Sequence, residues 1–209
     1  MARDKLKLAS RVRSQVAHRP GMEFLVVMLA LFAGILRFFH LASKSFWLDE
    51  GGTAHRVAMP LVPLIASALN MYLYFVVVHG WQLVAGASEF MLRFPSAIFA
   101  TAAVPLIYAL GVELGVPNAG LMGALFVTVN ATCIQYAQTA RSYALLVLLV
   151  LLSSLLFLRS IRRASFGNCA AYVITGVSGV YTHLFAIFTP VSQLPSLFIF
   201  RPERRLPSD

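Results

Sequence analysis

Apolar stretches of about twenty residues recur along the chain and constrain its fold more than any other feature. A helix of about 20 residues crosses the roughly 30 Å of hydrocarbon in a bilayer. The candidate spans are Met22 to Leu41, Phe94 to Leu114, Asn118 to Gln135, Tyr143 to Leu158, Asn168 to Tyr181 and Leu184 to Phe200. Only 12% of the residues are charged, against about 25% in soluble proteins. The sequence predicts an all-α polytopic transmembrane helical bundle of about six spanning helices.

Basic residues stand in blocks beside the apolar runs and carry most of the net charge of +9. No nucleic-acid-binding motif accompanies them, so no nucleic-acid partner is expected. Such blocks mark cytoplasmic flanks of membrane helices. We therefore expect a basic cytoplasmic tail at 1–21, a transmembrane domain at 22–200 and a second, truncated cytoplasmic tail at 201–209. The predicted location is the cytoplasmic (inner) membrane, with the N-terminus inside.

The stretch from Pro60 to Gly86 is apolar but interrupted by proline and polar residues. The cytoplasmic markers at 1–21 and 159–163 require an even number of crossings between them. Four result only if this stretch does not cross. We expect it to lie along the outer interface as one or two amphipathic juxtamembrane helices, within a first outer loop at about 42–93. Residues 43–93, 138–142 and 181–183 would then all face the outside.

An acidic pair, Asp49 and Glu50, follows the first span in a chain with only eight acidic residues. A carboxylate in that position can take a proton from an attacking hydroxyl as a general base. A neighbouring carboxylate can hold a divalent cation or orient the acceptor. A hydrated loop or a helix N-terminus, which favours acidic residues, explains the pair equally well.

Several segments together resemble one enzyme family. They are Leu36-Arg-Phe-Phe-His-Leu, Ser45-Phe-Trp-Leu-Asp-Glu, Ser88-Glu-Phe-Met-Leu-Arg-Phe-Pro-Ser, Pro105-Leu-Ile-Tyr-Ala-Leu-Gly, Gln135-Tyr-Ala-Gln-Thr-Ala-Arg-Ser-Tyr-Ala-Leu and Tyr181-Thr-His-Leu-Phe. In this order they resemble the GT-C superfamily of integral-membrane glycosyltransferases, and in particular the RgtA/B/C/D-like relatives of the protein O-mannosyltransferases. The resemblance covers roughly residues 35 to 193.

The resemblance implies a sugar donor carried on a polyprenyl phosphate and a hydroxyl acceptor on a glycan, lipid or protein at the outer face of the membrane. It implies that Asp49 is the general base and Glu50 its partner. Arginine suits a phosphate through planar, bidentate hydrogen bonding, and Arg141, Arg93 and Arg37 are the candidates. Each of these arginines could instead extend its charged end to the membrane surface.

Histidine and aromatic side chains on the predicted outer face are further candidates for substrate binding. His183 and His79 can hydrogen-bond a sugar or phosphate or bind a metal, or simply lie at the interface. Tyr143 can stack on a sugar or guide the prenyl chain, although an interfacial aromatic belt accounts for it as well. Cys133 and Cys169 are expected to be packed thiols.

The chain also departs from the family pattern. The region 68–74 lacks the paired prolines and acidic residue usual there, and Thr139 stands where a second carboxylate is usual. A divalent metal ion thus remains open. Family members are longer, so a partner chain that supplies missing helices is one expectation. The alternative to a glycosyltransferase is a non-catalytic fragment, a membrane scaffold or a transporter component.

Overall fold

The computed structural model of the chain describes residues 20–67, 71–163 and 165–199, and within these ranges the secondary structure is helical, without strands. The elements in chain order are α2 (Pro20–Phe38), α3 (Leu48–Val57), α4 (Leu61–Ser67), α5 (Tyr72–Ala85), α6 (Glu89–Glu113), α7 (Pro117–Val129), α8 (Ala131–Ala137), α9 (Tyr143–Arg162), α10 (Phe166–Thr182), the 3₁₀ helix η1 (Leu184–Ile187) and α11 (Phe188–Ile199). The expected α-helical bundle is confirmed for this part of the chain. The predicted basic tails lie almost entirely outside it.

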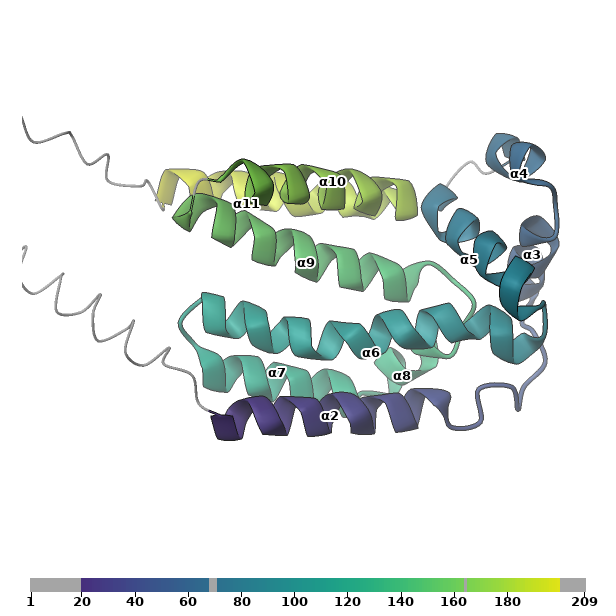
Figure 1. Cartoon of the computed structure of the whole chain (residues 1–209), viewed down its shortest axis with the longest axis horizontal. Helices are drawn as coiled ribbons and strands as arrows, with labels where there is room; N and C mark the ends of the chain where they lie inside the picture. Colours follow the sequence, from purple (N-terminus) through teal and green to yellow (C-terminus); the bar gives the residue numbers. More distant parts are fainter. Residues whose placement is uncertain (1–19, 68–70, 164, 200–209) are drawn as a thin grey trace, which may run out of the picture.

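The long helices lie side by side along one axis, and α3, α4 and α5 lie together at one end of that bundle (Figure 1). Helix α6 packs against α2, α7 and α9, and α9 packs in turn against α10. The start of α2 and the ends of α9 and α11 lie at the opposite end from α3–α5 (Figure 1). The two basic markers would lie on the same side of a membrane only if the chain crossed it an even number of times between them. The start of α2 and residues 159–162 at the end of α9 do lie at the same end of the bundle (Figure 1).

Three of the described helices are long and apolar enough to cross a membrane: α2 over Gly21–Phe38, α6 and α9. Helices α7 and α8 qualify as a fourth only if they are one broken span, because they are bent by 64°. Helix α10 has 17 residues, about 25 Å at 1.5 Å per residue, and α11 has 12. The described residues therefore contain three or four candidate spans, and the predicted six are not confirmed. The predicted span from Asn118 to Gln135 is interrupted at Asn130, where α7 ends and the chain bends into α8.

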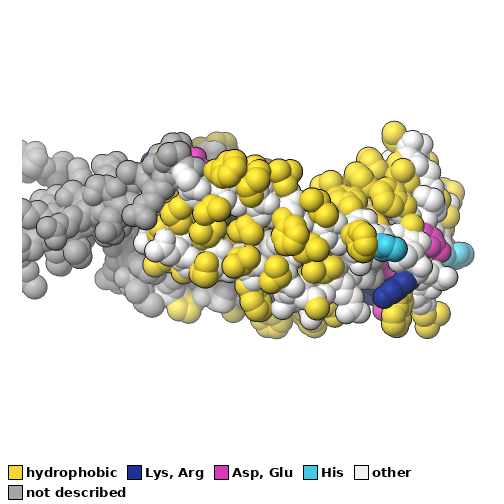
Figure 2. All heavy atoms as spheres, turned by 90° about the horizontal axis from the view of Figure 1, so that it is seen from below, with side chains coloured by type: hydrophobic (Ala, Val, Ile, Leu, Met, Phe, Trp, Pro, Cys, Tyr) yellow, Lys and Arg dark blue, Asp and Glu magenta, His cyan; other side chains and the backbone are white. Residues whose placement is uncertain are grey.

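Large apolar side chains cover the outside of the bundle. Figure 2 shows them along one face of it, while most of the charged and histidine side chains on that face gather at one end. Phe24, Ile35, Ile174 and Phe188 are each more than half exposed. A surface of this extent is far larger than the apolar patches of soluble monomers and is typical of a surface that faces lipid.

Helices α6 and α7 approach each other at a pair of glycines. A Cβ atom on Gly111 would come within 2.5 Å of the Cα of Gly120. Small residues at such crossings let two membrane helices pack backbone to backbone. The tight α6–α7 pair gives the bundle a rigid centre, against which α2 and α9 pack.

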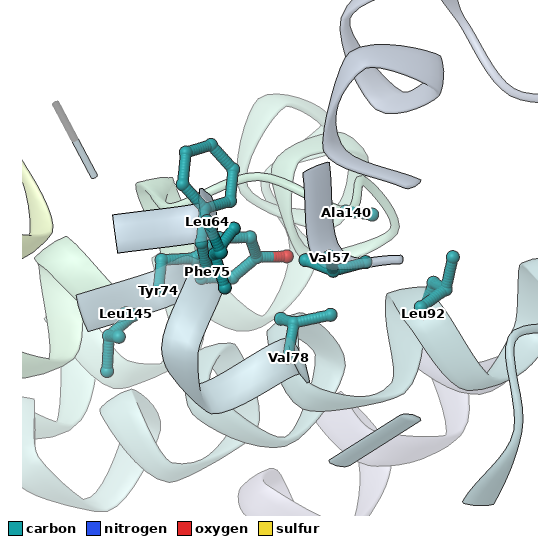
Figure 3. Close-up of a cluster of buried hydrophobic side chains, with 8 residues drawn as sticks. All are labelled: Val57, Leu64, Tyr74, Phe75, Val78, Leu92, Ala140 and Leu145. Atoms are coloured by element: carbon teal, nitrogen blue, oxygen red, sulfur yellow. The ribbon is translucent and has the colours of Figure 1, made fainter. Parts of the chain in front are cut away.

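A cluster of buried side chains attaches α3–α5 to the bundle (Figure 3). Its members come from α3–α5, from α6 and from the segment around the start of α9: Val57, Leu64, Tyr74, Phe75, Val78, Leu92, Ala140 and Leu145. Burying these side chains stabilises the docked loop through the hydrophobic effect. The cluster therefore fixes the acidic pair of α3 relative to the segment that carries Arg141.

Candidate functional site

Glu50 joins the first outer loop to two other parts of the chain. Its side chain is only 1% exposed, and both of its oxygens accept hydrogen bonds. Oε1 accepts from Nε of Arg93 and from the amide of Ala140, each at 2.8 Å. Oε2 accepts from Nη2 of Arg93 at 2.8 Å and from the amide of Trp47 at 3.2 Å. The carboxylate is thus fully occupied by protein donors.

Arg93, in the first turns of α6, is the cation of this pair and is itself only 3% exposed. Its guanidinium also reaches three backbone carbonyls of the segment between α2 and α3, those of Leu41 (2.9 Å), Lys44 (2.8 Å) and Ser45 (3.3 Å). It lies 5.2 Å from the ring centroid of Phe46. Arg93 therefore positions the entry to α3 and has little capacity left for a substrate phosphate.

The pKa of Glu50 shows how strongly its partners act. Burial by itself would raise the pKa of the carboxyl group. The hydrogen bonds from Arg93, from the amides of Ala140 and Trp47, and the positive charge of Arg93 outweigh burial and hold the pKa below its ordinary value. Glu50 is therefore a carboxylate at neutral pH and cannot act as an acid.

Asp49, the neighbour of Glu50, lies in the opposite environment. Its side chain is 74% exposed, and Oδ2 lies 4.0 Å from Nη2 of Arg141. Nη1 of Arg141 also donates to the backbone carbonyl of Asp49 at 3.4 Å. The two side chains, 92 positions apart in the sequence, meet without a tight hydrogen bond between them, so both remain available to a ligand.

Asp49 and Arg141 line an open cavity of about 730 Å³, which we call the outer cavity. Its walls come from the end of α2 with the following loop, the start of α3, α8 and the turn before α9. The polar and charged residues that line it are His40, Ser43, Lys44, Asp49, Glu50, Arg93, Gln135, Tyr136, Gln138, Thr139, Arg141 and Tyr143. A volume of this size is within the range of sites for small organic ligands.

A short chain of hydrogen bonds holds the backbone of Arg141 in place. The hydroxyl of Tyr74, buried in the cluster of Figure 3, lies 2.9 Å from the hydroxyl of Ser96 on α6. Ser96 in turn donates to the carbonyl of Arg141 at 3.2 Å. The Nε of Arg141 is buried and has no hydrogen-bond partner among the described residues. The backbone of Arg141 is therefore fixed, while its guanidinium keeps hydrogen-bond donors that no described residue uses.

Gln138 attaches the same turn to the first membrane helix. Its side-chain amide donates to three carbonyls at the end of α2, those of Leu36 (3.2 Å), Arg37 (3.3 Å) and Phe39 (2.9 Å). The last carbonyls of a helix have no partner within it, so an outside donor stabilises the helix end. The turn that carries Arg141 is consequently held against α2, α3 and α6 at once.

Arg37 lies below the outer cavity and is fully buried. Nη1 donates to the carbonyl of Ala33 at 3.1 Å, and Nη2 donates to the carbonyl of Val127 at 3.0 Å, near the break between α7 and α8. Arg37 borders a second, apolar cavity of about 110 Å³ that Tyr143 also lines. Arg37 thus satisfies backbone groups at the helix break and does not line the outer cavity.

The remaining predicted site residues divide between the outer cavity and its surroundings. Tyr143 lines the outer cavity. His183 lies beside it, with ring centroids 6.1 Å apart, but does not line the cavity. His79 lies elsewhere, because its Nδ1 is 2.7 Å from the carbonyl of Val57 in the contact between α3 and α5. The structure thus brings Asp49, Arg141 and Tyr143 together, with His183 at the margin.

The described residues contain no group of three or more His, Cys, Asp and Glu side chains that could hold a metal ion. Cys133 is partly buried and lines the small cavity, as expected of a packed thiol. Cys169 is exposed on α10. The prediction that it is a packed thiol was wrong, because its side chain is exposed in the described part of the chain.

Several residues of the outer cavity were missed in the sequence, and two of them matter most for the site. Lys44 contributes an exposed cation to its wall, and Gln138 holds the turn before α9. Gln138 falls inside the segment from Gln135 to Arg141 that carries part of the family resemblance, so that pattern could have identified it. Lys44 has no comparable signal, because a lysine after a membrane helix is common at an interface.

Three helices of this length and polarity, with an apolar exterior, indicate an α-helical membrane protein. Its polar outer cavity lies at the end of the bundle where α3–α5 are. Comparisons with protein-family models, with curated proteins and with solved structures found no match to the chain.

Proposed function

We propose that the chain is an integral-membrane glycosyltransferase that moves a sugar from a polyprenyl-phosphate donor to a hydroxyl acceptor. The observation that carries the proposal is the meeting of Asp49 and Arg141 in one open cavity. A carboxylate that is largely free and an arginine with unused donors are the two groups that this reaction needs. Four of the six segments in which the sequence resembles the GT-C superfamily contribute residues to the lining of the cavity.

In the proposed reaction, Asp49 accepts the proton of the acceptor hydroxyl as that oxygen attacks the anomeric carbon of the sugar. The bond from the anomeric carbon to the phosphate oxygen breaks, and the polyprenyl phosphate leaves with the electron pair. Arg141 stabilises the charge that develops on the phosphate, with Lys44 as a second cation on the same wall. Glu50 and Arg93 contact neither substrate and position Asp49.

The proposal extends to the topology. The chain would pass six times through the cytoplasmic membrane, with α7 and α8 as one broken span and with the shorter α10 and α11 also crossing. The outer cavity would then open at the outer face, where the acceptor on a glycan, lipid or protein is found. A partner chain would supply further helices for the prenyl chain, beyond the wall that Tyr143 provides.

Sugar transfer in membranes that contain the parent chain or its Asp49→Asn variant tests the proposal. A polyprenyl-phosphate sugar serves as donor, and transfer to an extractable acceptor is measured. Removing a general base lowers the rate by about 10²- to 10⁴-fold. Glu113→Gln is the matched control, because Glu113 pairs with Arg159 and Arg162 at the other end of the bundle. Equal transfer by the parent chain and the Asp49→Asn variant would contradict the assignment of Asp49.

A further inference from the structure

The first residues of α3 form an exposed apolar tip. Trp47, the N-cap residue, is 67% exposed, and Leu48, the first residue of the helix, is 93% exposed. Trp47 borders the outer cavity, whereas Leu48 is not among the residues that line it. Apolar side chains that are this exposed are usually buried by something outside the protein when they occur together.

The tip is held in place and cannot fold back to bury these side chains. The amide of Trp47 donates to Oε2 of Glu50, and the same carboxylate is bound by Arg93 and by the amide of Ala140. Three separate segments therefore fix the direction in which the tip projects. In a wholly aqueous environment this rigid projection would keep apolar surface in water permanently, which the hydrophobic effect opposes.

The tip continues the apolar surface of the first membrane helix. On α2 the exposed apolar side chains extend to Phe39, which is 66% exposed just beyond the end of the helix. Phe39 and Trp47 border the same outer cavity, and the exposed Lys44 lies on its wall between them in sequence. An apolar surface that ends in a tryptophan and a lysine is typical of the boundary between hydrocarbon and headgroups.

We propose that Trp47 and Leu48 insert into the headgroup layer of the bilayer, with Lys44 directed to the lipid phosphates. The mouth of the outer cavity then opens at the level of the headgroups. A ligand can enter it sideways from the membrane, without crossing bulk water. This assignment concerns the position of the tip and does not depend on the reaction proposed above.

The sequence offers a direct test because it contains only two tryptophans, Trp47 and Trp81. The Trp81→Phe variant leaves Trp47 as the only indole reporter. Trp81 is stacked on Phe94 with ring centroids 5.0 Å apart, and its indole N–H donates to the carbonyl of Met91. The full chain would be reconstituted in vesicles of phosphatidylcholine and phosphatidylglycerol that carry bromine at a shallow or a deep position of the acyl chain. Aqueous iodide provides the complementary quencher.

The expected result is strong quenching of Trp47 by shallow bromines, weaker quenching by deep bromines and little quenching by iodide. Quenching by iodide without quenching by bromine would overturn the proposal, because the tip would lie in water. Protection from all quenchers would also overturn it, since a protein surface would then cover the tip. Strongest quenching by the deep bromines would place the tip in hydrocarbon and contradict the headgroup assignment.

A matched pair of leucine variants in the Trp81→Phe background adds a second measurement. Leu48→Glu should shift the emission of Trp47 to longer wavelength and reduce its quenching by shallow bromines, because a carboxylate resists insertion. Leu114→Glu makes the same change on an exposed leucine after α6, at the other end of the bundle, and should leave Trp47 unchanged. Far-ultraviolet circular dichroism establishes that both variants keep their helices. No difference between the two variants would count against the proposal.

Discussion

Two carboxylate–arginine pairs lie next to each other at the end of the bundle where α3–α5 are, and they differ in almost every physical respect. Glu50 and Arg93 are buried, share two hydrogen bonds of 2.8 Å and also bind the backbone of two other segments. Asp49 and Arg141 are 4.0 Å apart, and the carboxylate is mostly in solvent. Adjacent residues of one helix have therefore acquired separate tasks.

The difference follows from where the two side chains of α3 point. Glu50 points toward α6 and the turn before α9, where its charge is desolvated but fully compensated by protein donors. Asp49 points into the outer cavity, where water is available and where a ligand can replace it. A buried pair is costly to break, whereas an exposed pair contributes little stability. Stability should therefore depend on the first pair, and chemistry on the second.

Breaking the buried pair should have the largest effect on stability. Glu50→Gln leaves the guanidinium of Arg93 buried without a counter-charge, and such changes cost about 3–5 kcal/mol. Thermal or denaturant unfolding of the detergent-solubilised protein measures the loss. Glu113→Gln, which removes a carboxylate from the partly exposed pairs with Arg159 and Arg162, is the control and should cost about 1 kcal/mol or less. Similar losses for both variants would contradict the distinction.

The same pair should make stability depend on pH. Because the folded state holds the pKa of Glu50 below its ordinary value, the carboxylate stabilises the fold at any pH above that ordinary value, about 4.3. The stabilisation should be lost as the pH falls from there through the lower pKa of the folded state. Unfolding of the parent chain and of Glu50→Gln, compared between about pH 3 and pH 7, measures this. A pH dependence that is identical in the two proteins would show that Glu50 is not its source.

An intermediate effect is expected at Gln138, which supports the exposed pair without belonging to it. Gln138→Ala leaves three carbonyls at the end of α2 without their side-chain donor, and the loss of such hydrogen bonds costs about 1–3 kcal/mol when the groups stay buried. Because Phe39 and its neighbours are partly exposed, water should replace part of the loss. Unfolding measurements should place Gln138→Ala between Glu50→Gln and Asp49→Asn. A loss of stability as large as that of Glu50→Gln would contradict this ranking and show that the fold depends on Gln138 as strongly as on the buried pair.

Much of the fold could be predicted because hydrophobicity over long windows is a strong signal. The α-helical bundle follows from the apolar runs. The placement of basic residues predicts that the stretch from Pro60 to Gly86 does not cross, and α4 and α5 lie together at one end of the bundle. The number of spans could not be fixed in the same way. Asn130 ends α7 and caps α8, so a single polar residue ends a helix inside a run that is apolar on average. His183, which caps η1, lies between two of the predicted spans.

The sequence pointed to Asp49, Arg141 and Tyr143, which line the outer cavity, but it did not reveal their partners. The acidic pair and the arginines stand out in a chain with few charges, yet adjacency in sequence gave no reason to separate Asp49 from Glu50. That separation depends on which side of α3 faces α6, a property of the packing of Leu92 and its neighbours. His79 was predicted as a site residue but contacts the carbonyl of Val57 instead. The sequence cannot separate these two roles, because a histidine near the membrane surface fits both.

The smallest effect on stability is expected at Asp49, the carboxylate of the exposed pair. Asp49→Asn should change the free energy of unfolding by no more than about 1 kcal/mol, because its carboxylate is 74% exposed and solvent already screens the contact. Arg141→Gln should cost more, because the arginine is only 14% exposed and loses packing as well. The double variant should show a coupling between the two residues that is also small, as unfolding of all four proteins would measure. A loss near that of Glu50→Gln would mean that Asp49 is part of the scaffold. A small loss of stability combined with a loss of sugar transfer would show that Asp49 acts in the reaction and not in folding. The exposure of Asp49 in the outer cavity leads us to expect this result.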